Sequence, residues 1–179
     1  MTTPERRADA ESRLRKAHGT LGAAKALIAL DPPCRDDAVN RASMAALQAA
    51  RALIDSKWAR DSHPGWDASW RAPRALSARE GFSLEALQRL LDRFERLSSS
   101  LQLAPDFPQY LRTLVEDGLE ADAGEGPEYD DEEARRAIAT SEQLVMTVAG
   151  QLGMSEELRT FAPPVPPAPA AAVIPFRSP

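Results

Sequence analysis

Apolar residues recur every three or four positions through most of the chain, the spacing that places them on one face of an α-helix. Stretches with this pattern cover residues 4–30, 36–58, 83–101, 106–123 and 130–152, and a short helical turn is expected near 155–161. Alanine and leucine dominate, whereas β-branched residues are scarce. We therefore expect an all-α fold, an antiparallel bundle of about five helices.

Proline, glycine and capping residues mark where these helices begin and end. Pro32 and its neighbours stop the first helix, because proline cannot continue a helix and restricts the residue before it. Asp36 or Asp37 is the expected N-cap of the second helix and Ser83 that of the third. Gly153 stands where a left-handed glycine would end the fifth.

Two segments differ from the helical pattern. Residues 59–81 contain prolines, glycines and two of the three tryptophans, so we interpret them as an insertion within a helical domain of residues 1–161. Residues 162–179 contain seven prolines and five alanines. That composition favours polyproline II or disorder, so a disordered Pro/Ala-rich C-terminal tail is predicted.

Composition narrows the class of protein. One Cys and two His among 179 residues exclude an internal disulfide and a zinc site built from Cys and His. No apolar run approaches the ~18 residues of a transmembrane helix. The charged start MTTPERRADAESRLRK lacks the apolar stretch of a signal peptide. We expect a cytoplasmic protein with no membrane association and no cofactor.

Charge is segregated along the chain, whose formal net charge is −5. Residues 1–60 hold 11 basic and 7 acidic side chains, whereas residues 104–134 hold one Arg and 11 acidic side chains. The acidic stretch lacks the ligand spacing of an EF-hand, so no metal site is predicted there. We interpret it as solvated helix starts, which would repel the phosphates of a nucleic acid.

A basic patch on the first helix is the candidate anion site. Its residues are Arg13, Arg15, Lys16 and His18, with Arg41 of the second helix as a further candidate. A histidine beside cations can contact phosphate or transfer a proton. We favour the simpler interpretation, in which His18 is a surface histidine and Arg41 pairs with acids of the fourth or fifth helix; anion binding stays the alternative.

Tryptophans and arginines gather around the insertion, at Trp58, Trp66, Trp70, Arg71 and Arg74. These are the residue types that protein interfaces use most as anchors, and they also stack on single-stranded nucleic acid. We predict a partner-binding element here. Packing of the tryptophans against the bundle is the alternative of equal weight, and nucleic-acid binding is a lesser one.

The tail ends with three apolar residues, Val173, Ile174 and Phe176, beyond a spacer without charges. This arrangement is typical of a short linear motif on a tether. We include the three residues in the predicted partner-binding set, with plain disorder as the alternative.

The second helix resembles the core helix of HEPN proteins, which are small helical bundles of bacteria and archaea. Residues 41–54 read R-A-S-M-A-A-L-Q-A-A-R-A-L-I and share the family's arginine, its alanines and its leucine at Arg41, Ala45, Ala49, Ala50, Ala52 and Leu53. Ala121 with Asp122 gives a second partial match, and the E-A-x-x-A-I stretch at residues 133–138 gives a third.

The resemblance implies a bacterial, non-catalytic module of regulatory function. HEPN ribonucleases carry an Arg followed a few residues later by a His, whereas Arg112 is followed by T-L-V-E-D-G. Since HEPN-like proteins commonly pair with themselves or with another protein, it implies a homodimer that binds a protein partner. Two alternatives stay open: a HEPN-type ribonuclease or toxin with its catalytic role moved to His18, and an accessory protein that binds single-stranded nucleic acid.

Overall fold

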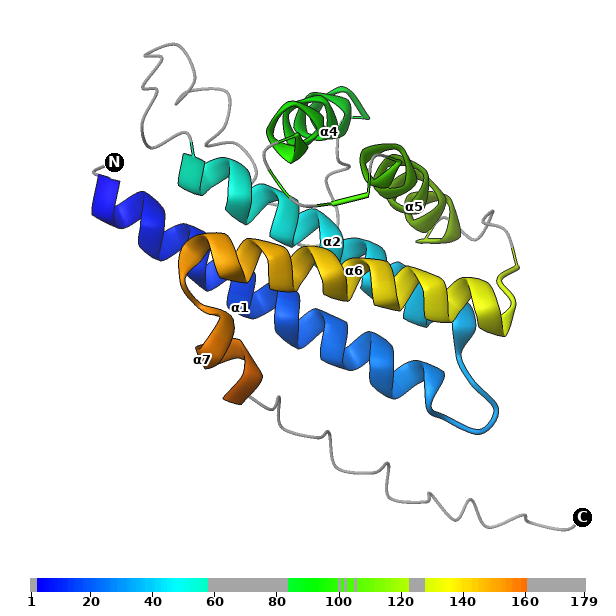
Figure 1. Ribbon diagram of the computed structural model, residues 1–179. Coiled ribbons are helices and arrows are strands. Elements are labelled where there is room, and N and C mark those ends of the chain that lie inside the picture. Colours follow the sequence, from blue (N-terminus) through cyan, green and yellow to red (C-terminus); the bar gives the residue numbers. More distant parts are fainter. Residues whose placement is uncertain are drawn as a thin grey trace, which may run out of the picture.

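The computed structural model of the chain describes residues 3–57, 84–99, 101, 103–104, 106–122 and 128–160. Within these ranges the chain forms six helices and no strand (Figure 1): α1 (Thr3–Ile28), α2 (Arg35–Lys57), α4 (Leu84–Ser98), α5 (Phe107–Asp122), α6 (Asp131–Leu152) and α7 (Ser155–Thr160). The predicted all-α bundle, with a short helical turn after its last long helix, is confirmed. No helix in the described ranges is both long and apolar enough to span a membrane.

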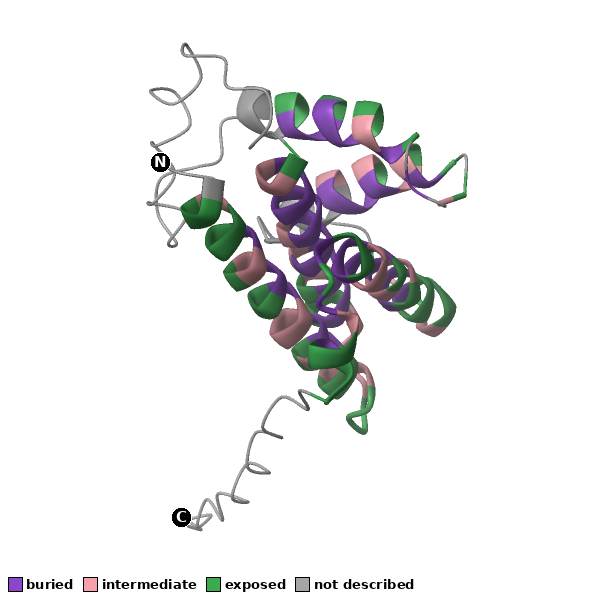
Figure 2. Ribbon diagram, turned by 60° about the vertical axis from the view of Figure 1, so that its left-hand side comes forward, coloured by how far each residue is buried: buried purple, intermediate pink, exposed green. Residues whose placement is uncertain are grey.

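The centre of the bundle is α2, which contacts α1, α4, α5 and α6. Figure 2 shows buried residues on most sides of this helix. Thirteen of its 23 residues are buried, seven of them alanines: Ala38, Ala42, Ala45, Ala46, Ala49, Ala50 and Ala52. Because these side chains are small, the neighbouring helices can approach α2 closely on several sides.

The direction of the helices follows from the contacts at their ends. α1 and α2 are consecutive and run antiparallel, as expected (Figure 1). α2 and α6 run parallel, because Arg35 pairs with Asp131 where both helices start and Lys57 bonds to Gln151 where both end. The expected antiparallel packing therefore holds for α1 and α2, whereas α2 and α6 pack side by side in the same direction.

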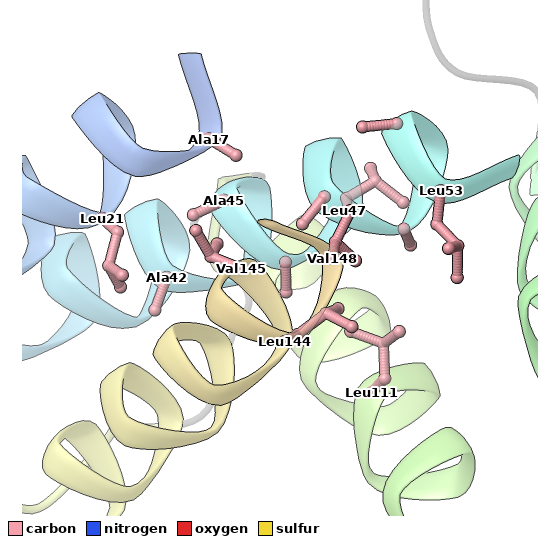
Figure 3. Close-up of a cluster of buried hydrophobic side chains, with 14 of the residues drawn as sticks. Ala17, Leu21, Ala42, Ala45, Leu47, Leu53, Leu111, Leu144, Val145 and Val148 are labelled. Carbon is pink, nitrogen blue, oxygen red and sulfur yellow. The ribbon is translucent and has the colours of Figure 1, made fainter. Parts of the chain in front are cut away.

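One continuous hydrophobic core takes residues from every described helix. Figure 3 shows side chains of α1, α2, α5 and α6 meeting in it. Among the described residues, the largest fully buried side chain is Phe94 of α4, whose ring lies tilted against Phe107 of α5 with 6.3 Å between the ring centroids. This aromatic pair joins α4 to α5.

A single hydroxyl interrupts the apolar surface of α6. Ser141 is fully buried, and its Oγ donates a hydrogen bond of 2.9 Å to the backbone carbonyl oxygen of Ala42 in α2. A buried hydroxyl needs such a partner, since leaving it unpaired would cost its desolvation energy. The bond ties the middles of the two parallel helices together.

The C-terminal end of α6 matches its predicted signal. Gly153 has φ 73° and ψ 24°, in the left-handed region, and forms the C-cap. The N–H of Met154 donates to the carbonyl of Ala149, and that of Gly153 donates to the carbonyl of Gly150. This is the Schellman pattern, which satisfies carbonyl groups that the helix end leaves open.

The ends of α1 and α2 differ from the predictions. α1 ends at Ile28, two residues before the expected end, and the N–H of Cys34 then donates to the carbonyl of Leu27. α2 begins at Arg35, with the carbonyl of Cys34 accepting from Ala38. The prediction that Asp36 or Asp37 caps α2 is therefore wrong. One reason is that the Asp36 carboxylate instead accepts a hydrogen bond from the backbone of Tyr129.

Candidate functional site

The residues predicted to bind a protein partner lie outside the described part of the chain. They are Trp58, Trp66, Trp70, Arg71 and Arg74 around the insertion, and Val173, Ile174 and Phe176 in the tail. Their role stays a prediction from the sequence. The residues on which both segments are mounted, Lys57, Leu84 and Thr160, belong to described helices.

The residues predicted to bind an anion do not assemble into one site. Arg13 faces α2, with its Nε 2.9 Å from an Asp55 carboxylate oxygen. Arg15 faces α7 and donates to both carboxylate oxygens of Glu157, at 2.6 and 3.3 Å. Each of these cations is therefore compensated by an acid of a neighbouring helix, which leaves less charge for a phosphate.

Lys16 and Arg41, the other two cations of the predicted anion site, are exposed. We expected Arg41 to pair with an acid of a later helix and to hold the bundle in register. Within the described residues Arg41 has no ion pair, and Arg35 fills that role by pairing with Asp131. The reason is position: Arg35 is at the very start of α2, opposite the first turn of α6.

His18 lies on α1 in a partly buried position, and its Nδ1 atom is buried. The prediction of a histidine on a solvated face is therefore wrong. Burial lowers the pKa of His18, the nearby Lys25 lowers it further, and Glu142 of α6 acts in the opposite direction. The imidazole is consequently neutral at pH 7.

In the part of the chain that the structure describes, two arginines are buried, Arg51 of α2 and Arg93 of α4, each 9% exposed. Burial lowers the pKa of both, and like charges nearby, Arg13 beside Arg51 and Arg96 beside Arg93, lower it further. In this buried position the aliphatic stem of Arg51 can cover apolar surface.

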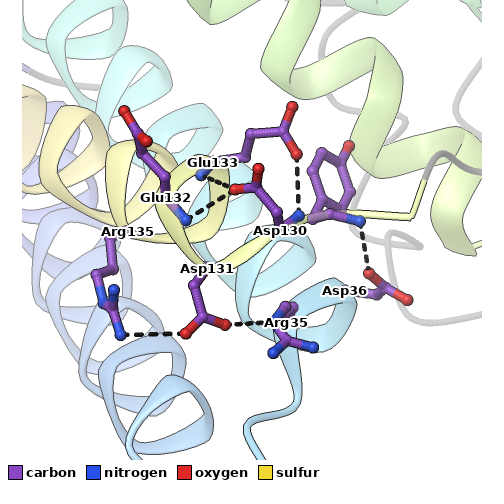
Figure 4. A network of polar contacts seen from close by, with 8 residues as sticks. Arg35, Asp36, Asp130, Asp131, Glu132, Glu133 and Arg135 are labelled. Atoms are coloured by element: carbon purple, nitrogen blue, oxygen red, sulfur yellow. Dashed lines mark hydrogen bonds and ion pairs between the residues drawn. The ribbon is translucent and has the colours of Figure 1, made fainter.

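A polar network joins the starts of α2 and α6 (Figure 4). The guanidinium of Arg35 donates to the carboxylate of Asp131, whose other oxygen accepts from Arg135 at 3.3 Å. The hydrogen bond from Arg35 is the main cause that lowers the pKa of Asp131. The carboxylate therefore stays ionised and keeps its bridge between the helices at neutral pH.

The same network caps α6. One carboxylate oxygen of Asp130 accepts from the backbone N–H groups of Glu132 and Glu133, both at 2.8 Å. In turn, the Glu133 carboxylate accepts from the N–H of Asp130 at 2.9 Å, which completes a capping box. At least part of the acidic stretch thus serves to start a helix, as predicted.

Beside this network is a hollow of about 360 Å³ lined by Pro33, Cys34, Arg35, Asp36, Asp37, Glu128 and Tyr129. Arg35 and Asp36 are occupied by bonds to Asp131 and to the Tyr129 backbone. The polar side chains that line the hollow therefore serve mainly to connect the start of α2 with the start of α6. In the described ranges no group of three or more His, Cys, Asp or Glu side chains is arranged to hold a metal ion.

Three residues important in the structure were not predicted: Arg35, Ser141 and Glu157. Only Ser141 had a readable signal, because it is a polar residue within the apolar stripe of Ile138 and Val145. The ion pairs of Arg35 and Glu157 join helices far apart in sequence, and no local pattern marks them.

Comparisons of the chain with protein-family models, with curated proteins and with solved structures find no match. Any assignment of function must therefore be argued from the residues of this chain.

Proposed function

We propose that the chain is a non-catalytic interaction module of HEPN-like type, which binds a protein partner in the cytoplasm through its tryptophan-bearing insertion and its apolar tail. The helical bundle is the scaffold on which the two binding segments are mounted. The proposal joins the family resemblance of α2 with the chemistry of the two segments.

The observation that carries the proposal is a contact at one end of the bundle. Nζ of Lys57 donates to Oε1 of Gln151 at 3.2 Å. Lys57 is the last residue of α2, directly before Trp58, and Gln151 belongs to the last turn of α6, just before α7 and the tail. The insertion therefore starts at the same end of the bundle at which the chain turns toward the tail (Figure 1).

Two binding segments carried by the same bundle favour one partner held at two points. When one segment is bound, the second is held close to its own site, so its binding becomes effectively intramolecular. Tryptophan and arginine in the insertion supply large anchors, and Val173, Ile174 and Phe176 supply a short apolar motif.

The bundle suits the role of a scaffold because its charges connect its own helices. Cross-helix ion pairs join α1 to α2, α6 and α7, through Arg13 with Asp55, Lys25 with Glu142 and Arg15 with Glu157. Among the described residues, Leu30 is the one large apolar side chain that is well exposed.

The test is an affinity capture from cytoplasm with four baits: the full chain, a chain ending at Phe161, the double change Trp66→Ala with Trp70→Ala, and Leu30→Ala as control. Circular dichroism checks that each bait keeps its helices. We expect one protein to be recovered by the full chain and by Leu30→Ala, with and without nuclease, and to be lost with the other two baits.

Two results would overturn this proposal. One is recovery of the same protein by all four baits, since the bundle surface would then be the binding site. The other is loss of every protein after nuclease treatment, which would favour the nucleic-acid alternative and direct attention to the tryptophans as stacking residues.

Dimerisation is the second part of the proposal, and the family resemblance supports it. The buried alanines of α2 are covered by the chain's own helices, with each at most 1% exposed. A dimer must therefore use another surface. Sedimentation of the full chain over a range of concentrations tests it, and a monomer at every concentration would contradict it.

A further inference from the structure

We propose that one side of α4 is a docking surface for an acidic segment of the protein partner. The surface is a row of three arginines, Arg89, Arg93 and Arg96, which we call the arginine row. The link to the partner rests on the function proposed above, whereas the binding of carboxylates to the row is a property of this chain alone.

The three arginines share one face of a helix at the edge of the bundle. They follow one another at steps of four and three residues, the spacing that places side chains above each other along a helix. At a rise of about 1.5 Å per residue, the row extends over about 10 Å. Arg89 and Arg96 are exposed, and Arg93 between them is 9% exposed. Since α4 lies beside α5 on the outer side of α2 (Figure 1), a partner can reach both ends of the row.

Two acidic side chains of the same helix are engaged by α5. Arg112 of α5 donates to Asp92 at 2.7 Å and lies 3.9 Å from a carboxylate oxygen of Glu95. The Nε of Arg96 donates to the backbone carbonyl of Asp92 at 3.2 Å. Charge is thus divided around α4, with the acids that Arg112 compensates on one side and the arginine row on the adjacent side.

The arginines of the row act on one another. Burial lowers the pKa of Arg93, and the charges of Arg96 and Arg89 lower it further. The like charges are therefore close enough to repel one another. Carboxylates along the row would offset this repulsion, and a guanidinium can bind a carboxylate through two parallel hydrogen bonds. The arrangement consequently favours an anionic partner.

The charge of the rest of the chain favours an acidic peptide over a nucleic acid. The formal net charge is −5, and residues 104–134 hold 11 acidic side chains and one Arg. A long phosphate backbone would be repelled by this charge. A short helix with Asp or Glu at positions i, i+4 and i+7 instead presents three carboxylates at the spacing of the arginine row.

The test measures binding of a synthetic helical peptide with Glu at positions i, i+4 and i+7 to the full chain, by titration calorimetry at about 50 and 300 mM NaCl. Arg89→Gln with Arg96→Gln removes the two exposed ends of the row. The matched control, Gln109→Glu with Gln143→Glu at exposed positions of α5 and α6, lowers the net charge by the same amount. Circular dichroism checks that both variants keep their helices.

We expect the loss of the two arginines to weaken peptide binding by at least about tenfold, because two charge-assisted contacts are removed. The control should weaken it by less than about threefold. Binding to the natural chain should also be weaker at the higher salt concentration, since salt screens exposed charges.

Three results would overturn the docking surface: no binding of the peptide to the natural chain, equal weakening by the two double variants, or tighter binding of a single-stranded oligonucleotide of the same charge. None of them decides the function proposed above, which is judged by partner capture with the tryptophan and tail baits. A partner captured in that way should be recovered less well with Arg89→Gln plus Arg96→Gln, and unchanged recovery would overturn the link between the row and that partner.

Discussion

Ser141 of α6 donates its hydroxyl hydrogen to the carbonyl oxygen of Ala42 in α2, at 2.9 Å and out of contact with water. The two residues are 99 positions apart in sequence. The bond therefore links the first helical pair to the last long helix at the middle of the core.

Replacing Ser141 by Ala should lower the free energy of unfolding by about 1 kcal/mol, the net value of a typical buried hydrogen bond. The Ala42 carbonyl belongs to a helix interior and keeps its backbone partner, so the loss stays moderate. Urea unfolding followed by circular dichroism measures it. Ser12→Ala, at an exposed position on α1, is the matched control; equal stabilities of the two variants would show that the bond contributes nothing.

Ala45→Leu should destabilise the bundle by about 1–3 kcal/mol, because the added methyl groups overfill a close contact. Ala45 is 0% exposed and lies in the core of Figure 3. Ala23→Leu makes the same change on the exposed side of α1 and should have little effect. Thermal unfolding of both variants compares them. A tolerated Leu at position 45 would contradict close packing around α2.

Two Gly→Ala substitutions should act in opposite directions. At Gly19, within α1, an added Cβ meets nothing within 4 Å, so Ala should stabilise by about 0.5–1 kcal/mol through its better helix propensity. At Gly153, with φ 73°, Ala should destabilise by about 1–2 kcal/mol, the cost of the left-handed conformation. Urea midpoints measure both, and a change of the same sign at both positions would be inconsistent with the cap.

Stability should fall as the pH drops below about 6.5, partly through His18. Burial and Lys25 lower the pKa of His18 in the folded protein, so below the ordinary value of 6.5 the unfolded chain binds a proton that the folded chain does not. Unfolding free energies at pH 7.5 and 5.5 should differ more for the natural protein than for His18→Gln. The carboxylates titrate alike in the natural protein and in His18→Gln. If the unfolding free energy changed equally between the two pH values in both proteins, His18 would be excluded as the cause.

Local signals in the sequence predicted the helices well. The apolar spacing placed all six described helices within a few residues, and Gly153 and the acidic start of α6 were predicted from cap chemistry that involves only neighbouring residues. The N-cap prediction for α2 failed, and a distant group is one reason: the Asp36 carboxylate bonds to the backbone of Tyr129, 93 residues away.

Relations between helices were not predictable in the same way. Periodicity shows which face of a helix is buried but not which helix covers it, so the parallel α2/α6 pair has no sequence signature. The choice of Arg41 rather than Arg35 as the pairing residue failed for the same reason, because Asp131 lies 96 residues from Arg35. Charged groups outside the described residues, including Arg71 and Arg74, stay predictions from composition.

The parallel contact of α2 with α6 has a consequence for the chain as it is made on the ribosome. Translation adds roughly 5–20 residues per second, so about 5–20 s pass between the synthesis of Ala42 and that of Ser141. During that interval α1 and α2 can pair, but the side of α2 that α6 later covers has no partner from its own chain. Until α6 arrives, this alanine surface stays open to solvent, and its burial completes the core.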